Sequence, residues 1–304
     1  MKNGNGLTRT GKDKVFSLFL ALPAVAMTVI FILVPVVDSV IKSFTKYQIK
    51  NIISGKPGTW NNFANYIKLF QNAKLPQAIA NTFIFVIVVV LCAFVLGMML
   101  ALILNAGVKG AKIIQGVMMT PWVIPTVISA LIWMWLFQPQ YGLVKYLVSL
   151  ISGGAVSELA VLNNPKTALM GISIASLWKQ VPLMTLLLLA GLSNVPEELL
   201  EAATVDGANR VQRFFNITIP SMKSVITIAV SMSIIENFKQ FPLFWTMTGG
   251  GPDGATTTLA ILSYREAFVS QDLGSGAAVT TVWMLLMIVV IFIYNKLMKR
   301  GETA

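Results

Sequence analysis

Long runs without a charged residue constrain the fold of this chain more than any other feature of its sequence. Four such runs extend over 15–37, 75–108, 113–144 and 273–295. A helix needs about 20 mostly apolar residues to cross the hydrocarbon of a bilayer. Two further apolar stretches contain isolated charges, at Lys179 in the first and at Glu236 and Lys239 in the second. We therefore expect six membrane spans, at 15–40, 77–105, 112–137, 167–192, 222–248 and 273–298.

The composition supports a membrane protein built from helices. Hydrophobic residues make up 56% of the chain and charged residues only 12%, whereas soluble domains carry about 25% charged residues. The apolar runs do not alternate with period two, which disfavours a barrel, and helices satisfy their own backbone groups in lipid. A basic flank also makes the first run resemble a signal peptide, but its apolar part exceeds the usual 7–15 residues. We interpret it as a retained first helix.

Several kinds of chemistry are excluded by residue counts. The chain has no His and a single Cys, Cys92, so His-based zinc or haem sites and an internal disulfide are excluded. We expect no catalytic residues, no metal site and no cofactor. The net charge of +11 suits a protein beside anionic lipid, and nucleic acid is a poor partner because the basic residues are dispersed among the spans.

The distribution of Lys and Arg gives a weak indication of topology. Six spans place both termini on one side, and a small excess of basic residues in short loops favours the cytoplasm for that side. The Lys-rich loop at 41–76 opposes this assignment. We expect a cytoplasmic tail at 1–14, a first helix at 15–40, an extracytoplasmic loop at 41–76, a five-helix core at 77–298 and a cytoplasmic tail at 299–304.

One polar segment, 193–220, separates two of the expected spans. Ser193 or Asn194 is suited to cap a helix there, and the acidic residues that follow favour its N-terminus. Gly207 interrupts the helix, and a second amphipathic piece continues to Pro220. The pattern predicts a helix, a turn and a second helix at the membrane surface.

The spacing within this segment carries a resemblance to a known family. Glu201-Ala202-Ala203 is followed by Gly207 after three residues. Nine further residues lead to Ile217, and one more residue separates it from Ile219-Pro220. This pattern resembles the EAA loop of binding-protein-dependent ABC importer permeases, with Ile219 where Leu is usual. Residues throughout the chain resemble sugar permeases of the maltose type. The resemblance implies an all-α membrane protein with six transmembrane helices, a MetI-like permease core and one extra N-terminal helix.

The resemblance also implies which residues couple this chain to an ATPase and which partners it assembles with. The loop would dock on a cytoplasmic ATPase, and a separate ATPase is implied because the chain has no GxxxxGK[ST] sequence. The implied coupling residues are Glu201, Ala202, Ala203, Asp206, Gly207, Ala208, Ile217 and Pro220. The implied partners are a second homologous permease in a heterodimer, two ATPase subunits, an extracytoplasmic solute-binding protein, a sugar and the lipid bilayer. The chain would be a transport subunit in a bacterial or archaeal cell membrane, with both termini cytoplasmic.

Polar side chains within two spans are candidates for substrate binding. Ionisable residues in a bilayer are costly and often functional, and amides with aromatic rings suit sugars. On a helix, Ser233, Glu236, Asn237, Gln240 and Phe244 share one face. Together with positions that the resemblance carries over, the expected substrate site is Lys179, Gln180, Leu183, Ser233, Glu236, Asn237 and Gln240. Alternatives are a structural ion pair of Glu236 with Lys239 or Lys179, and hydrogen bonds between helices for Asn237 and Gln240.

Two functions from other classes compete with an importer permease. An ion-coupled secondary transporter would require intramembrane acids and repeats, but only Glu236 lies mid-span and no clear repeat is visible. A membrane-embedded enzyme would require a nucleophile, for which Ser176 with Lys179 is conceivable but supported only by a three-residue spacing.

Overall fold

The computed structural model describes residues 7–153 and 159–300, so the ends of both predicted tails, 1–6 and 301–304, lie outside the described residues. These residues form two compact units. Unit 1 holds the chain up to Gln71 together with Arg265–Thr281, and unit 2 holds Asn72–Tyr264 together with the chain from Val282 onward.

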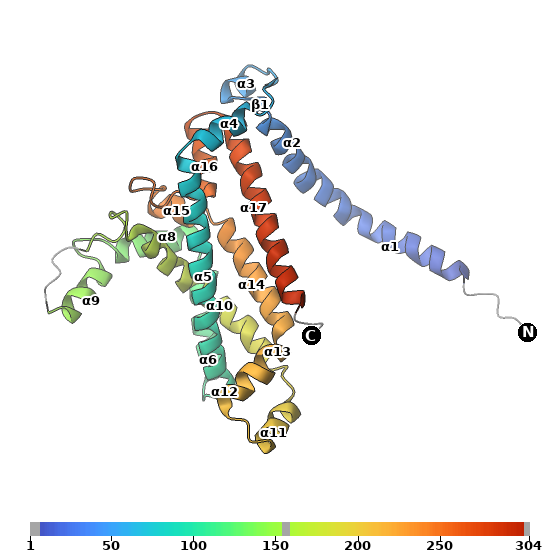
Figure 1. Cartoon of the computed structure of the whole chain (residues 1–304), viewed down its shortest axis with the longest axis vertical. Helices are drawn as coiled ribbons and strands as arrows, with labels where there is room; N and C mark the ends of the chain where they lie inside the picture. The colour runs from blue at the N-terminus through green and yellow to red at the C-terminus, as the bar shows by residue number, and fades with distance from the viewer. Residues whose placement is uncertain (1–6, 154–158, 301–304) are drawn as a thin grey trace, which may run out of the picture. The chain divides into compact units, whose positions relative to one another are not determined.

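Four helical stretches are long and apolar enough to cross a membrane, and two bent helix pairs bring the total to as many as six. The prediction of a helical membrane protein is therefore confirmed. The first stretch is formed by α1, η1 and α2 in direct succession and the others by single helices (Figure 1). Their bounds are α1 Leu7–Thr28, η1 Val29–Leu33, α2 Val34–Ser43, α5 Lys74–Asn105, α10 Ala168–Leu192 and α17 Leu273–Arg300.

The third predicted span, 112–137, is broken rather than continuous. α6 (Ala111–Met118) and α7 (Thr120–Val123) lead to Ile124, after which α8 (Thr126–Leu136) leaves at 94°. Ile124 has an extended backbone with ψ 131°, as expected before Pro125, because a proline ring disfavours helical angles in the preceding residue. This predicted span is therefore a bent pair of helices rather than one straight helix.

The fifth predicted span, 222–248, is likewise interrupted. α14 (Lys223–Phe238) ends before Lys239, and α15 (Pro242–Met247) begins with a proline. At its other end α14 follows a bent segment at 72° to it. That segment comprises α12 Arg210–Arg213, η2 Phe214–Thr218 and α13 Ile219–Ser221.

Most of the predicted loop at 41–76 is a folded segment of unit 1. The first helical stretch continues to Ser43, and α5 starts at Lys74, so the segment between the spans is shorter than expected. Two short strands pair antiparallel within it, with Thr45 opposite Trp60. The elements are β1 Thr45–Lys46, α3 Ile49–Ile53, β2 Thr59–Trp60 and α4 Ala64–Gln71; the later part of unit 1 contains η3 Arg265–Val269 and the start of α17.

The core of unit 2 is formed by α5, α10 and α14, which pack side by side (Figure 1). Gly97 of α5 permits this packing, because an added Cβ would lie 2.8 Å from Met184 Cγ of α10. Buried residues form one cluster around Phe85, Ile172 and Phe244 and another around Met184 and Leu188. The remaining helices of unit 2 are α9 Leu143–Ile151, α11 Glu197–Val205 and α16 Leu259–Tyr264.

Candidate functional site

A cavity of about 420 Å³ opens between α10, α14 and the break that separates α7 from α8. This volume lies within the range of about 300–1,000 Å³ that is usual for small-molecule sites. Six of the seven predicted substrate-site residues line it, and only Asn237 does not. The lining residues are Trp122, Thr126, Lys179, Gln180, Leu183, Met184, Leu187, Ala229, Met232, Ser233, Glu236 and Gln240.

Asn237 lies behind the cavity wall and holds Gln180 in place. It is only 2% exposed. Its Nδ2 donates to Gln180 Oε1 at 2.8 Å, and Gln180 Nε2 donates in return to Asn237 Oδ1 at 2.8 Å. Gln180 Nε2 also donates to Ser176 Oγ, and Ser233 Oγ to Gln180 Oε1. Except for the Gln180–Ser176 bond, which lies within α10, these bonds cross from α10 to α14. Interhelical hydrogen bonding was the alternative predicted for Asn237.

Glu236 forms an ion pair with Lys239, as one predicted alternative has it, and not with Lys179. Lys239 Nζ lies 2.7 Å from Glu236 Oε1, and both side chains are more than half exposed. Lys179 instead donates to the backbone carbonyl of Ile124 at the α7–α8 break. Among the described residues, Lys179 makes no ion pair with Glu236 or any other carboxylate. It therefore supplies the cavity with a cation whose only described hydrogen-bond acceptor is a neutral oxygen.

The predicted polar face on one continuous helix was wrong at its far end. Because α14 ends at Phe238, Gln240 lies in the link that follows it and still reaches the cavity. Phe244 belongs to α15 and is fully buried, with its ring edge-on to Phe85 at 4.7 Å. It is a core residue and does not line the cavity.

Sequence reasoning missed the contribution of the α7–α8 break to the cavity. Trp122 and Thr126 line the cavity from either side of Pro125. Pro121 and Pro125 were a usable signal, because two prolines four residues apart interrupt helical hydrogen bonding. The described residues contain no group of three or more His, Cys, Asp or Glu side chains placed to hold a metal ion.

The predicted helix–turn–helix is present between α11 and α12, and its turn is tightly bonded. Gly207 has φ +80° and follows α11 in a Schellman arrangement, with bonds from Ala208 N to Ala203 O and from Gly207 N to Thr204 O. Glycine adopts this left-handed conformation without the steric cost that a Cβ brings.

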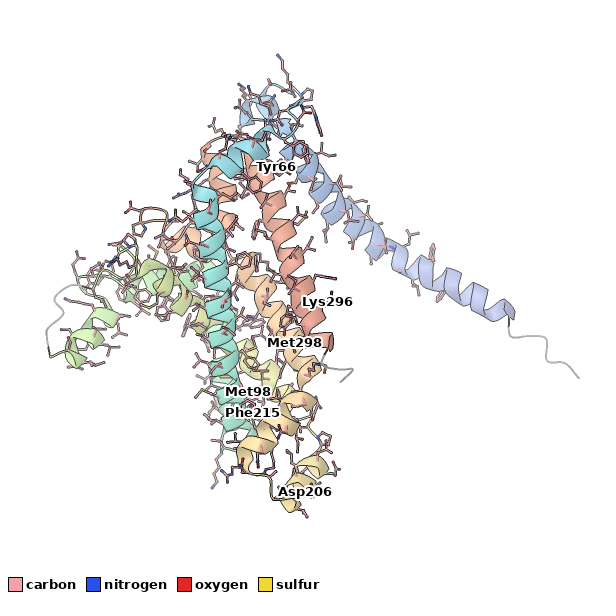
Figure 2. The ribbon with its side chains drawn as sticks, viewed as in Figure 1. Tyr66, Met98, Asp206, Phe215, Lys296 and Met298 are labelled. Carbon is pink, nitrogen blue, oxygen red and sulfur yellow. The ribbon has the colours of Figure 1, made fainter. Side chains whose placement is uncertain are left out.

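The second half of the turn is fixed by side chains. Asn209 caps α12 by accepting from Gln212 N at 2.9 Å, while Gln212 Oε1 accepts from Asn209 N at 2.8 Å. Arg213 Nη1 then donates to Thr204 Oγ1 at 2.7 Å, which joins α12 to α11. The loop is thus pre-organised, and Asp206 lies at its tip (Figure 2).

The loop presents its motif residues outward. Glu201, Ala202, Asp206 and Gly207 are exposed, and no residue of α11 is buried. Val205, the last residue of α11, is 88% exposed, which is an unusually large exposure for an apolar side chain. The predicted cap was wrong: the extended residue before α11 is Pro196, while Ser193 and Asn194 donate backward to carbonyls of α10.

Comparison with known proteins assigns this chain to a protein family. Residues 93–302 match the model for the binding-protein-dependent transport system inner membrane component. The chain belongs to this family. Its members are inner-membrane transport subunits, so the predicted MetI-like permease fold is confirmed and the protein is a transport subunit rather than an enzyme. The family also excludes the secondary-transporter alternative.

Relatives in the family are similar over nearly their whole length. The trehalose/maltose transport system permease protein MalF of Thermococcus litoralis is 33% identical over 96% of this chain and 97% of its own. The sulfoquinovosyl glycerol transport system permease protein SmoG of Agrobacterium fabrum is 31% identical over 95% and 92%. A chain of a bacterial ABC transporter that imports the acidic polysaccharide alginate has the same fold, with a TM-score of 0.80, 21% identity and coverage of 97% and 98%.

Proposed function

We propose that this chain is the permease subunit of an ATP-driven ABC importer and that its cavity forms part of the pathway for a sugar or oligosaccharide. The observation that carries the proposal is the cavity itself, which places amide, hydroxyl and charged groups between membrane helices. Placing such groups in a bilayer costs free energy, so they usually mark the pathway of a polar solute. Relatives are named for trehalose and maltose and for sulfoquinovosyl glycerol, which supports a carbohydrate or a carbohydrate derivative.

The lining residues suit a sugar in complementary ways. Gln180, Ser233 and Gln240 offer donors and acceptors for hydroxyl groups, and Trp122 offers a ring that can cover a C–H face. Lys179 and Glu236 add charge-assisted hydrogen bonds, while Leu183 closes the wall. Asn237 acts through Gln180, whose amide it orients.

The exposed loop is proposed as the contact with the ATPase. Its small residues Ala202, Ala203 and Gly207 permit close approach, Glu201 and Asp206 offer polar anchors, and Val205 offers an apolar one. Ala208, Ile217 and Pro220 complete the coupling set by shaping the path from the loop to α14. Because the turn is stiffened by its own hydrogen bonds, a push on it is transmitted to the membrane helices as a rigid-body movement.

The proposed assembly follows from this loop. It contains a second, homologous permease, two ATPase subunits and an extracytoplasmic solute-binding protein. The loop at 193–220 lies in the cytoplasm, and with six spans both termini lie there too. The first helix then precedes a five-helix permease core, and the segment between the first helix and α5 lies outside the cell.

Filling the cavity tests the proposed pathway. Leu183→Trp adds a large ring to the cavity wall, and Ile174→Trp adds the same ring to an exposed apolar position elsewhere on α10. Both variants are assembled with the ATPase and reconstituted in vesicles with the binding protein. We expect Leu183→Trp to abolish sugar uptake while basal ATP hydrolysis persists, and Ile174→Trp to transport normally. Normal uptake by the assembled Leu183→Trp variant contradicts the proposal.

A further inference from the structure

The segment that joins the first span to α5 has an unusual charge. Between residues 41 and 76 the sequence contains six lysines and no Asp or Glu. This contrasts with the usual preference of Lys and Arg for cytoplasmic loops, since the segment lies outside the cell in the proposed topology. The lysines are Lys42, Lys46, Lys50, Lys56, Lys68 and Lys74.

The same segment displays a row of large apolar side chains. Trp60, Phe63, Ile67 and Phe70 are 63%, 63%, 57% and 65% exposed, respectively. Phe63, Ile67 and Phe70 recur at steps of four and three, so they share one face of α4 and the residue before it. Leu69, on another face of α4, is only 6% exposed. We call these four outward residues the aromatic stripe.

Hydrogen bonds tie α4 to the end of the first span. Asn65 Nδ2 donates to Ser43 O at 2.8 Å and to Thr45 O at 2.9 Å, which satisfies carbonyls where α2 ends. Ser43 Oγ and Tyr66 Oη are 2.6 Å apart. Tyr66 accordingly lies where α2 and α4 meet (Figure 2). Phe44, the residue after α2, stacks on Trp60 with ring centroids 5.6 Å apart.

A second set of contacts ties α4 to the start of α17. Lys68 Nζ lies 3.4 Å from Asp272 Oδ2, and Asp272 accepts hydrogen bonds from the backbone and hydroxyl of Ser275 in the first turn of α17. Gly274 N donates to Tyr47 O at 2.9 Å. α4 is therefore fixed where α2 ends and α17 begins, within unit 1.

We propose that the aromatic stripe inserts into the headgroup region of the bilayer and that Lys46, Lys50 and Lys56 of the same segment, which make no ion pair among the described residues, bind anionic lipid. Three observations select a bilayer as the occupant. An 18-residue window of the first span, which leads into this segment, contains no buried residue; Trp is enriched at the depth where hydrocarbon meets headgroups; and the segment contains lysines but no Asp or Glu, which complements anionic phosphate groups. The short helix lies along the membrane surface as an amphipathic anchor.

Single-cysteine spin labelling of the reconstituted importer tests this placement. Cys92 is the only cysteine, so Cys92→Ser gives a background in which Phe63→Cys, Ile67→Cys and Phe70→Cys are each labelled uniquely. Ala64→Cys is the matched control, because Ala64 is exposed but turned about a quarter of a circle from the stripe. Collision rates with lipid-soluble oxygen and with a water-soluble nickel chelate are measured at each site. We expect oxygen to dominate at the three stripe positions and the chelate to dominate at the control.

Two outcomes overturn the proposal. Dominance of the chelate at all three stripe positions places the stripe in water. Protection from both reagents that ends when the binding protein or the second permease is removed assigns the stripe to a protein partner. Agreement among three independent positions keeps the test decisive if one variant fails to assemble.

A second measurement separates lipid charge from mere insertion. A fluorophore at the Ile67→Cys position is quenched by brominated phosphatidylglycerol or brominated phosphatidylcholine at equal mole fraction. We expect the anionic lipid to quench more strongly. Lys56→Gln, which removes one exposed lysine, should lower that preference by up to about fivefold, because one lysine near a charged surface contributes about 1 kcal/mol. Equal quenching by the two lipids in the unmodified segment refutes the anionic-lipid part of the proposal.

Discussion

Replacement of Gly207 by Ala isolates the contribution of backbone conformation to coupling. Gly207 has φ +80°, and an added Cβ meets no atom within 4 Å in this chain. The substitution therefore causes no clash within the chain, and its cost is the left-handed strain of an L-residue, about 1–2 kcal/mol. A change of that size shifts the balance between the bonded turn and other loop conformations by roughly 5- to 30-fold.

Gly207→Asn is the matched variant, because asparagine tolerates the left-handed region better than alanine although its side chain is larger. Both variants are assembled with the ATPase and assayed for sugar uptake and for stimulation of ATP hydrolysis by the loaded binding protein. We expect Gly207→Ala to lose most of the stimulation and Gly207→Asn to retain more of it. If Asn is as damaging as Ala or worse, contact with the ATPase rather than φ explains the glycine, and the conformational reasoning is refuted.

Three further substitutions test packing and polar contacts within unit 2. Asn237→Leu removes the two hydrogen bonds between Asn237 and the Gln180 amide and should lower stability in detergent by about 1–3 kcal/mol, with partial recovery on adding Gln180→Leu; a purely additive double mutant would contradict the pairing. Lys179→Met frees the carbonyl at the α7–α8 break and should lower Tm, whereas Lys179→Arg should retain more of it; equal Tm values would exclude a structural role. Gly97→Val overpacks the α5–α10 contact and should cost about 1–3 kcal/mol, whereas Gly116→Val, which faces open space, should cost little; chemical denaturation compares the two.

The apolar runs predicted where the membrane helices lie but not where they break. Hydropathy is insensitive to the difference between one straight helix and two helices joined at an angle, so the break within 112–137 was not predicted. The local chemistry of Pro125 and Pro242 decides the break, since each removes a backbone donor and restricts the residue before it.

The helix–turn–helix shape of the loop and its break at Gly207 were predictable, although its cap was not, and the cavity was predictable only in part. Gly207 and its neighbours form a local motif whose hydrogen bonds connect residues close in sequence. The cavity depends on contacts between helices far apart in the chain, so the placement of Asn237 behind Gln180 and of Lys179 against Ile124 could not follow from helical periodicity. Polar residue types in the right spans still predicted five of its lining residues, and the family resemblance added Leu183.

Cross-linking of the exposed loop tests the central claim most directly. Val205→Cys on the Cys92→Ser background places one thiol at the most exposed apolar position of α11. We expect this thiol to form a disulfide with a cysteine introduced on the ATPase surface that contacts the loop, uptake to stop, and a reductant to restore it. Labelling of the same thiol by an impermeant maleimide from outside sealed cells, or unimpaired uptake by the cross-linked complex, would contradict the account.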